Sequence, residues 1–274
     1  MVRLRRASLR LCANCGSWMY SPRGSAAEQA ALHDNAEYFD HPYFARRRTV
    51  TPAQRHRCRG VFQRLAVEPG RLRGERVLDI GCDTGTFLIA AREEFGIAPV
   101  GLDVAARAIA VAQDRGIEAH ATSIERAPES LGQFNIITAI DLIEHVADPA
   151  AFLCGVRDRL HPGGVFYVET PNLRSTVFGF GSLLSRMTGG LPAATLERLF
   201  PPHHVQLFNS ESLRSLAERN GLEVVRMGTR VLPGPDLAAP LIARCGLTAL
   251  QFCDRLLGRE ILVWAVLRRA TEAG

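Results

Sequence analysis

The chain has 274 residues, of which 47% are hydrophobic. This length allows one full α/β domain with an appendage, and the composition fits a globular protein with a sizeable core. The net charge is +5, and all 33 basic residues are arginines. Because lysine is absent, this excess indicates codon bias as much as polyanion binding, and we expect no nucleic-acid partner. Residues 46–48, and Arg55, Arg57 and Arg59, are expected on solvated faces, with an acidic substrate or nucleic acid as the alternative.

Targeting signals are not evident in the sequence. No stretch approaches the roughly 20 apolar residues that a transmembrane helix needs. The N-terminal arginines are followed by neither a long apolar run nor a small-residue cleavage site, so no secretory signal is predicted. The seven cysteines are scattered and odd in number, unlike a disulfide framework. These features predict a cytoplasmic protein.

Residues 1–50 are predicted to form an N-terminal arm. It contains Cys12-Ala13-Asn14-Cys15-Gly16, in which two thiolates on one tight turn can share a metal ion. A structural zinc ion needs four ligands, and the next cysteine, Cys58, stands alone in a helix predicted from Pro52 to Val67. We therefore expect no filled zinc site. The aromatic residues between Glu28 and Phe44 are predicted to pin the arm to the core.

The stretch from Arg76 to Ala90 combines a short apolar strand, a tight glycine turn and the beginning of a helix. Its glycines let a ligand approach the backbone, and the free N–H groups of the helix's first turn point at it. A second strand ends in Asp103, about 20 residues further on, where dinucleotide-binding folds place an acid that binds ribose hydroxyls. The alternative role for Asp103 is to cap the following helix. The G-x-x-x-G spacing fits neither the dinucleotide fingerprint nor a P-loop.

Strands and helices alternate along the chain. Further strands are predicted at Ile117–His120, Phe134–Ile140, Val165–Thr170, Leu222–Arg226 and Ile261–Leu267. Right-handed crossovers between them give an α/β fold with a seven-stranded, mostly parallel sheet and helices on both faces. The segment Asp236–Leu257 predicts an amphipathic helix that packs on the sheet or on a second subunit, with a membrane surface as the alternative.

The glycine stretch resembles motif I of the class I S-adenosylmethionine-dependent methyltransferases, in which an acid precedes G-x-G-x-G. Asp79, Gly81 and Gly85 match this motif, while Asp83 stands where a middle glycine is commonest. The L-x-P-G-G run at 160–164 resembles the entry to the fifth strand of that superfamily. The segment from Cys12 to Phe39 resembles the second half of a zinc ribbon that opens many small-molecule relatives. The resemblance implies a Rossmann-like fold, S-adenosylmethionine as cofactor, and an arm whose aromatic segment folds over the cleft.

The resemblance also implies which residues contact the cofactor. Asp103 would hold the ribose hydroxyls, and Ser123 stands where an acid usually binds the adenine amino group. The implied cofactor-binding set is Asp79, Gly81, Cys82, Asp83, Gly85, Asp103, Val104, Ser123, Ile124, Asp141 and Leu142.

The run from Asp141 to Pro149, D-x-x-E-H-V-x-D-P, resembles the motif after the fourth strand of the ubiquinone-type O-methyltransferases. His145 is the predicted general base, because imidazole titrates near neutral pH; a loop-bracing hydrogen bond is the alternative. Glu144 and His145 are also candidate metal ligands by analogy with some relatives, but two adjacent residues do not make a site, and no metal is predicted. His204, in an H-x-x-x-F run, is the second predicted catalytic residue, with a structural role as the alternative.

Residues 51–274 are thus predicted to form a methyltransferase domain with a lid-like insertion at 171–209. The predicted reaction is methyl transfer from S-adenosylmethionine to a small molecule, with oxygen as the first choice of acceptor and nitrogen or carbon left open. A monomer or homodimer is expected. One alternative is a non-catalytic cofactor-binding adaptor with a vestigial pocket, favoured by Asp83, Ser123 and the missing ribbon half. The other is an NAD-dependent oxidoreductase, which shares the ribose acid but requires the absent fingerprint.

Overall fold

The computed structural model describes residues 2–3, 8–13, 15–21, 49–188, 204–231, 252 and 254–270. The aromatic segment Glu28–Phe44, residues 46–48, part of the lid-like insertion and most of the helix predicted at Asp236–Leu257 lie outside the described residues. Within the described ranges, no helix has both the length and the apolar character needed to cross a membrane.

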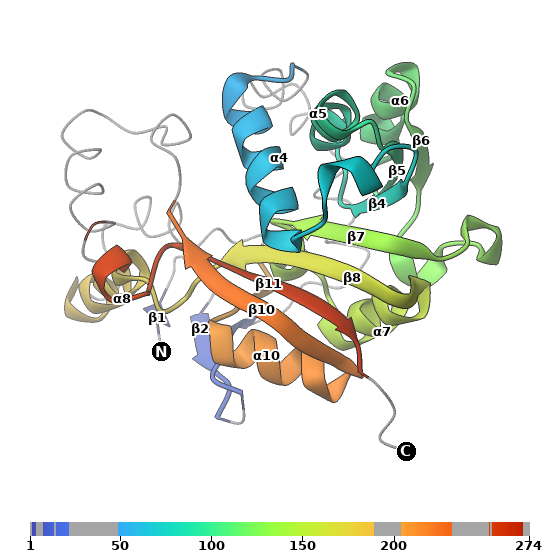
Figure 1. Ribbon diagram of the computed structural model, residues 1–274. Coiled ribbons are helices and arrows are strands. Elements are labelled where there is room, and N and C mark those ends of the chain that lie inside the picture. Colours follow the sequence, from blue (N-terminus) through green and yellow to red (C-terminus); the bar gives the residue numbers. More distant parts are fainter. Residues whose placement is uncertain are drawn as a thin grey trace.

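The central sheet has seven strands in the order β10-β11-β8-β7-β4-β5-β6 (Figure 1). Neighbouring strands from β8 to β6 run parallel, while β11 is antiparallel to both β8 and β10. The strands are β4 (Arg76–Ile80), β5 (Ala98–Asp103), β6 (Glu118–Ala121), β7 (Phe134–Ile140), β8 (Leu160–Pro171), β10 (Leu222–Arg230) and β11 (Leu262–Arg269). The predicted α/β fold with a seven-stranded, mostly parallel sheet is confirmed.

Helices cover both faces of this sheet (Figure 1). One layer holds α4 (Pro52–Leu65), α5 (Thr86–Phe95) and α6 (Ala106–Asp114), and the other holds α7 (Pro149–Arg159) and α10 (Ser210–Arg219). Side chains alternate along each strand, so Val77 of β4 packs with the first layer and Leu78 with the second. The sheet is therefore buried on both sides, as its nearly continuous apolar strands predict.

Helix α4 begins where the sequence predicts. Thr51 and Gln54 form a reciprocal capping box, and Pro52 occupies the first turn, where its missing N–H is not needed. The helix buries Cys58, Val61, Phe62 and Leu65, and the Phe62 ring packs against Phe95 of α5 at a centroid distance of 4.5 Å. This packing fixes α4 along one end of the sheet, next to the glycine turn.

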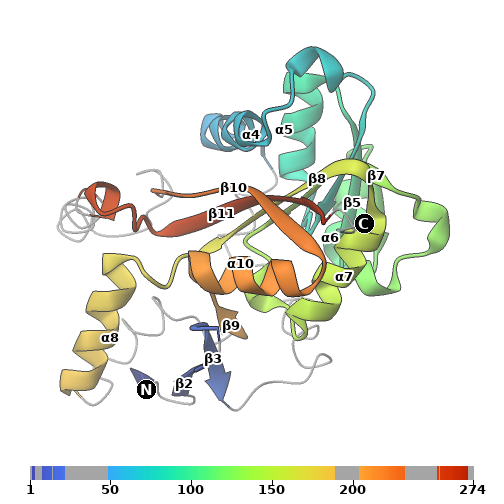
Figure 2. The ribbon, with the colours of Figure 1, turned by 60° about the horizontal axis from the view of Figure 1, so that its bottom comes forward.

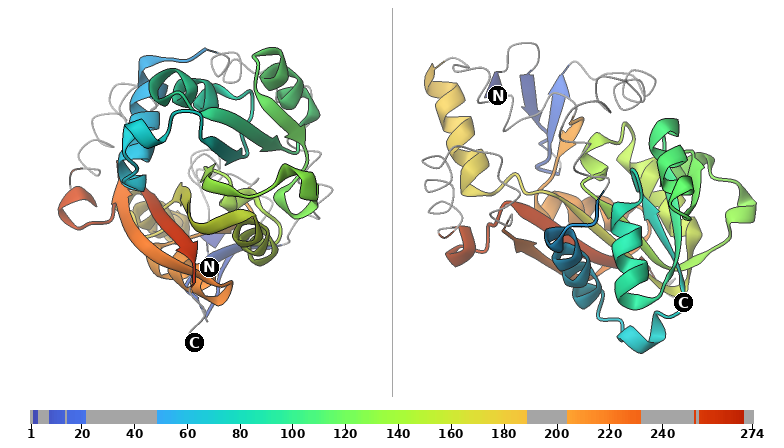
Figure 3. Two further views of the ribbon diagram at one scale, coloured as in Figure 1. Left: turned by 45° about the vertical axis from the view of Figure 1, so that its right-hand side comes forward. Right: turned by 90° about the horizontal axis from the view of Figure 1, so that it is seen from above.

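A second, four-stranded sheet joins the N-terminal arm to the insertion (Figure 2). Its antiparallel strands are β1 (Val2–Arg3), β2 (Ser8–Leu11), β3 (Trp18–Ser21) and β9 (Gln206–Leu207). Helix α8 (Thr176–Thr188) packs beside it through Val177 and Phe178, on the side of the molecule away from β5 and β6 (Figure 3). The arm is thus tied to residues after β8, while a domain boundary near residue 50 stays a prediction.

Cys12, Cys15 and Gly16 lie between β2 and β3. The backbone closes through Gly16 N–H to the Cys12 carbonyl at 2.9 Å, and the Asn209 amide donates to the Gly16 carbonyl at 3.2 Å. Cys12 and Cys15 are both half-buried. In the described part of the chain they belong to no group of three or more potential metal ligands.

The entry into β8 sets its register against β7 and can be tested by substitution. A Cβ on Gly164 would lie 2.8 Å from the Phe134 carbonyl oxygen and 3.0 Å from that of His161, and backbone atoms cannot move aside cheaply. We expect Gly164→Ala to lower the free energy of unfolding by about 3 kcal/mol, measured by urea denaturation. The control is Gly163→Ala, which meets no atom within 4 Å and bears only the strain of its positive φ, about 1 kcal/mol. Equal losses for the two variants would contradict this account of the register.

Candidate active site

A cleft opens at the carboxyl edge of the sheet, where β4 lies between β5 and β7 and the strand order reverses. Such switch points are where open α/β sheets bind ligands. The residues that line the cleft are Gln54, Arg57, Asp79, Gly81, Cys82, Asp83, Thr86, Phe87, Ile140 and Asp141. The structure therefore brings together five of the predicted cofactor contacts, Asp79, Gly81, Cys82, Asp83 and Asp141.

The glycine turn is shaped by left-handed backbone and close packing. Gly81 has φ 76°, which favours glycine, and a Cβ there would meet the Leu142 side chain at 2.9 Å, so that leucine would have to shift. Gly85, with φ 75°, is the N-cap of α5. Asp83 has φ 50°, which explains why glycine is commonest at this position and why aspartate is tolerated.

Asp103 lies at the end of β5 with both carboxylate oxygens fixed by backbone N–H groups. Oδ2 accepts from Asp83 at 3.0 Å and Oδ1 from Ala105 at 2.9 Å. The N-cap of α6 is Ala105, so Asp103 does not have the capping role that was its alternative. Its carboxylate is instead hydrogen-bonded to Asp83 of the glycine turn that lines the cleft.

Six of the predicted cofactor residues do not line the cleft. Gly85, Asp103 and Leu142 lie beside the glycine turn, where Gly85 caps α5, Asp103 bonds Asp83, and Leu142 lies against Gly81. The other three are Val104, Ser123 and Ile124. Val104 is 47% exposed, and Ile124 is buried in the core, where it packs against Gly155. Ser123 precedes a short 3₁₀ helix, Ile124–Arg126, which follows β6. A role for these three residues in binding the cofactor stays a prediction.

Asp79 is buried beneath the glycine turn. Burial raises the pKa of its carboxyl to about 7, although the hydrogen bond from Thr138 Oγ1, 2.6 Å long, favours the ionised form. At neutral pH this side chain is thus close to its midpoint of titration. A cation in the cleft would favour the carboxylate.

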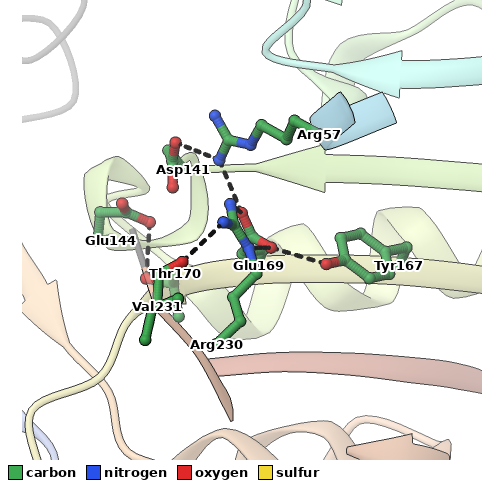
Figure 4. Close-up of polar contacts among 8 residues, drawn as sticks. All are labelled: Arg57, Asp141, Glu144, Tyr167, Glu169, Thr170, Arg230 and Val231. Carbon is green, nitrogen blue, oxygen red and sulfur yellow. Dashed lines mark hydrogen bonds and ion pairs between the residues drawn. The ribbon is translucent and has the colours of Figure 1, made fainter. Parts of the chain in front are cut away.

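Next to the cleft lies a buried ionic cluster built around Glu169 of β8 (Figure 4). Glu169 accepts hydrogen bonds from Tyr167 Oη at 2.7 Å, from Arg57 Nη2 at 2.7 Å, and from Arg230 Nε and Nη2 at 2.7 and 2.6 Å. Burial alone would raise the pKa of Glu169, but the charges and hydrogen bonds of the two arginines outweigh burial and lower it to about 2. Glu169 is therefore ionised at any physiological pH.

Arg57 joins this cluster to the cleft. Its Nη2 bonds both Glu169 and Asp141 Oδ2, the latter at 2.6 Å, while its Nε is buried without a hydrogen-bond partner in the described part of the chain. The prediction of a solvated face holds for Arg55 and Arg59, which pair with Glu93 and Glu94 of α5. It is wrong for Arg57, because residues two apart on a helix point in nearly opposite directions.

The two predicted catalytic histidines lie together with Glu144. The rings of His145 and His204 meet edge to face at a centroid distance of 4.8 Å. One ligand atom from each of Glu144, His145 and His204 lies within 4.8 Å of the others. A divalent cation about 2.1 Å from each ligand requires these atoms to approach slightly, so the trio has the donors for a cation and nearly the spacing.

Backbone pairing holds this trio in place. Val205 N–H donates to the Glu144 carbonyl at 2.7 Å, and Tyr20 N–H of β3 donates to the Val205 carbonyl at 3.1 Å. The Glu144 side chain accepts from Thr170 Oγ1 at 2.8 Å. Burial and the nearby charge of Asp141 raise the pKa of Glu144 to about 8.

Comparisons with known proteins agree with this geometry. The family described as "Methyltransferase domain" matches residues 47–227. The chain belongs to this methyltransferase family. A relative in Leptothrix cholodnii, a ubiquinone biosynthesis O-methyltransferase, is 32% identical over 192 residues, which cover 64% of this chain and 79% of the relative. The relative of the same name in Paracidovorax citrulli is 27% identical over 185 residues, covering 64% and 77%.

Solved structures of low sequence identity share the fold of the methyltransferase. Magnesium protoporphyrin IX methyltransferase from Synechocystis, with bound S-adenosylhomocysteine, aligns with a TM-score of 0.56 at 14% identity and covers 88% of this chain and 100% of that one. Phosphoethanolamine N-methyltransferase 2 from Haemonchus contortus aligns with a TM-score of 0.60 at 17% identity, covering 89% and 60%. The chain is an S-adenosylmethionine-dependent methyltransferase, and these findings support neither the adaptor nor the oxidoreductase alternative.

The titration of Asp79 predicts a pH dependence of stability. Its pKa is raised from 3.8 to about 7 on folding, so the folded state must keep a proton that the unfolded state loses. The contribution of Asp79 to the free energy of unfolding is complete below pH 4 and is lost as the pH rises to 7. Relative to Asp79→Asn, the wild-type methyltransferase should lose about 2–3 kcal/mol of unfolding free energy between pH 5 and pH 8.

Urea denaturation of both proteins across that range measures the difference, and the Glu144 contribution cancels because both proteins contain it. Parallel stability curves for the two proteins would show that Asp79 titrates as an ordinary carboxyl.

Proposed function

We propose that this methyltransferase transfers the methyl group of S-adenosylmethionine to a hydroxyl oxygen of a small molecule. The observation that carries the proposal is a cleft at the switch point together with a pair of histidines in contact, His145 in the loop after β7 and His204 just before β9. The sulfonium is already activated, so the protein needs to align the two reactants and remove the hydroxyl proton.

On the cofactor side, the ribose and the amino-acid tail of S-adenosylmethionine each bind to groups in or beside the cleft. Asp103 takes the ribose hydroxyls, because its carboxylate is fixed at the end of β5 beside the glycine turn. Gly81 and Gly85 allow close approach of the backbone. Arg57 takes the carboxylate of the methionine tail, because its side chain lines the cleft and its Nε has no hydrogen-bond partner in the described residues. The acidic Asp79 and Asp83 favour the tail's ammonium and the sulfonium.

On the acceptor side, His145 acts as the general base. His204 packs against it from the segment just before β9, and Glu144, anchored by Thr170, completes the trio. The relatives named ubiquinone biosynthesis O-methyltransferase support oxygen as the acceptor atom. A divalent cation on the trio would supply an alternative activation, by lowering the pKa of the bound hydroxyl.

The cysteines bear on the cellular compartment in which the reaction takes place. Among the described residues, Cys15, Cys58, Cys82 and Cys154 are in no disulfide, which supports a reducing compartment, and we propose the cytoplasm. A monomer or homodimer, a lid formed by residues 171–209 and the absence of a nucleic-acid partner remain part of this proposal.

The cofactor assignment is tested by calorimetry. We expect S-adenosylmethionine and S-adenosylhomocysteine to bind and NAD not to bind. Asp103→Asn should weaken both ligands by about tenfold or more, since it removes a charged acceptor. Glu125→Gln, which changes an exposed acid near the same edge, is the control and should leave binding unchanged. Binding of NAD, or product binding without turnover of any hydroxyl acceptor in a broad panel, would favour the rejected alternatives.

The acceptor side is tested by substitution and chelation together. His145→Gln should lower kcat by about 10²-fold or more, while the KM for S-adenosylmethionine stays within twofold. His204→Gln should have a smaller effect of the same kind. With a histidine base, activity survives EDTA. Loss of activity in EDTA and its recovery with Mg²⁺, Mn²⁺ or Zn²⁺ would show instead that the trio holds a cation.

A further inference from the structure

Glu169 is a charged residue in a place where an apolar one would pack. It lies in β8, within the run Val165–Thr170, and its side chain is completely buried between α4 and β10. A buried carboxylate is costly unless every lone pair is satisfied, and replacement of buried ion pairs by apolar side chains is often neutral for stability. Packing alone therefore does not explain a glutamate here.

The geometry around Glu169 fixes one side chain of the cleft. Arg230 of β10 binds both Glu169 oxygens at 2.6–2.7 Å, and Tyr167 adds a further hydrogen bond at 2.7 Å. The carboxylate is thus held from its own strand and from β10 and has little freedom to move. Its remaining bond goes to Arg57 Nη2.

Asp141, the other partner of Arg57, is a weaker anchor. Its side chain is 37% exposed, whereas that of Glu169 is 0% exposed. Asp141 also has a positive φ of 55° at the beginning of the loop after β7. A ligand carboxylate that enters the cleft can compete with Asp141 for Arg57, but it cannot reach the enclosed Glu169.

We propose that Glu169 is a positioning residue that holds the Arg57 guanidinium against the cleft wall, in the orientation that binds the carboxylate of the cofactor's amino-acid tail. This inference rests on the proposed function of Arg57. Glu169 does not touch the cofactor. It acts through Arg57, and Arg230 acts one step further back by fixing Glu169.

The test compares two ligands that differ only in this tail. S-adenosylhomocysteine carries the amino-acid group, and 5′-methylthioadenosine has the same thioether nucleoside with a methyl group in its place. Calorimetry on the full chain gives a Kd for each ligand. The Kd of methylthioadenosine divided by the Kd of S-adenosylhomocysteine reports the contribution of the tail, and this ratio falls when tail binding is lost. For Glu169→Gln we expect S-adenosylhomocysteine to bind about tenfold or more weakly, with methylthioadenosine within twofold of wild type.

Three variants complete the experiment. Glu169→Asp keeps the charge but withdraws it from Arg57, so it should lose the same selectivity in part, and it carries the test if Glu169→Gln does not fold. Tyr167→Phe removes one hydrogen bond from Glu169 but leaves both arginine pairs, and it should leave the ratio within twofold. Arg57→Met should lower the ratio at least as much as Glu169→Gln.

Each other result overturns a distinct statement. If Glu169→Gln weakens both ligands equally, Glu169 has a merely structural role and the inference is wrong. If Arg57→Met lowers the ratio and both Glu169 variants leave it unchanged, the inference is wrong but the proposed role of Arg57 stands. If Arg57→Met leaves the ratio unchanged, the cofactor tail binds elsewhere and both statements are wrong.

Discussion

The buried pairing of Glu169 with Arg57 and Arg230 is the interaction on which the geometry of the cleft depends. It joins β8 to α4 on one side and to β10 on the other, elements that are far apart in sequence. Because an uncompensated charge at this depth is strongly unfavourable, the three side chains must be present together. The cluster therefore limits how α4 can sit at the open end of the sheet, and α4 forms one wall of the cleft.

The alternation of side chains along β8 links this cluster to the histidines. Glu169 and its neighbour Thr170 point to opposite faces of the strand. Glu169 binds the arginine that lines the cleft, and Thr170 binds Glu144, which lies with His145 and His204. The backbone of Glu169 also accepts from Asp141 N–H at 2.9 Å, which fixes the beginning of the loop that carries His145. Two residues at the end of one strand thus set the separation between the two halves of the site.

Much of the fold and part of the site could be predicted from sequence, because strand-end motifs are local. Phe134–Ile140 was predicted to the residue, and the acids and glycines at the ends of β4, β5 and β7 meet at one edge because parallel strands share that edge. The role of Arg57 is hidden in sequence because Arg55, Arg57 and Arg59 look like one basic patch; only its phase on the helix separates Arg57 from the other two. Glu169 was missed although a lone acid in an apolar strand requires a partner. The pairing of β3 with β9 joins residues nearly 190 apart and has no local signal.

The most direct test of the central claim is a crystal structure of the protein with S-adenosylhomocysteine bound. We expect the tail carboxylate on Arg57 and the ribose hydroxyls on Asp103, with Arg57 still bonded to Glu169 and the Glu169–Arg230 pair unchanged. A cofactor tail held by other groups, with Arg57 turned away from Glu169, would contradict the claim that this buried cluster organises the cleft.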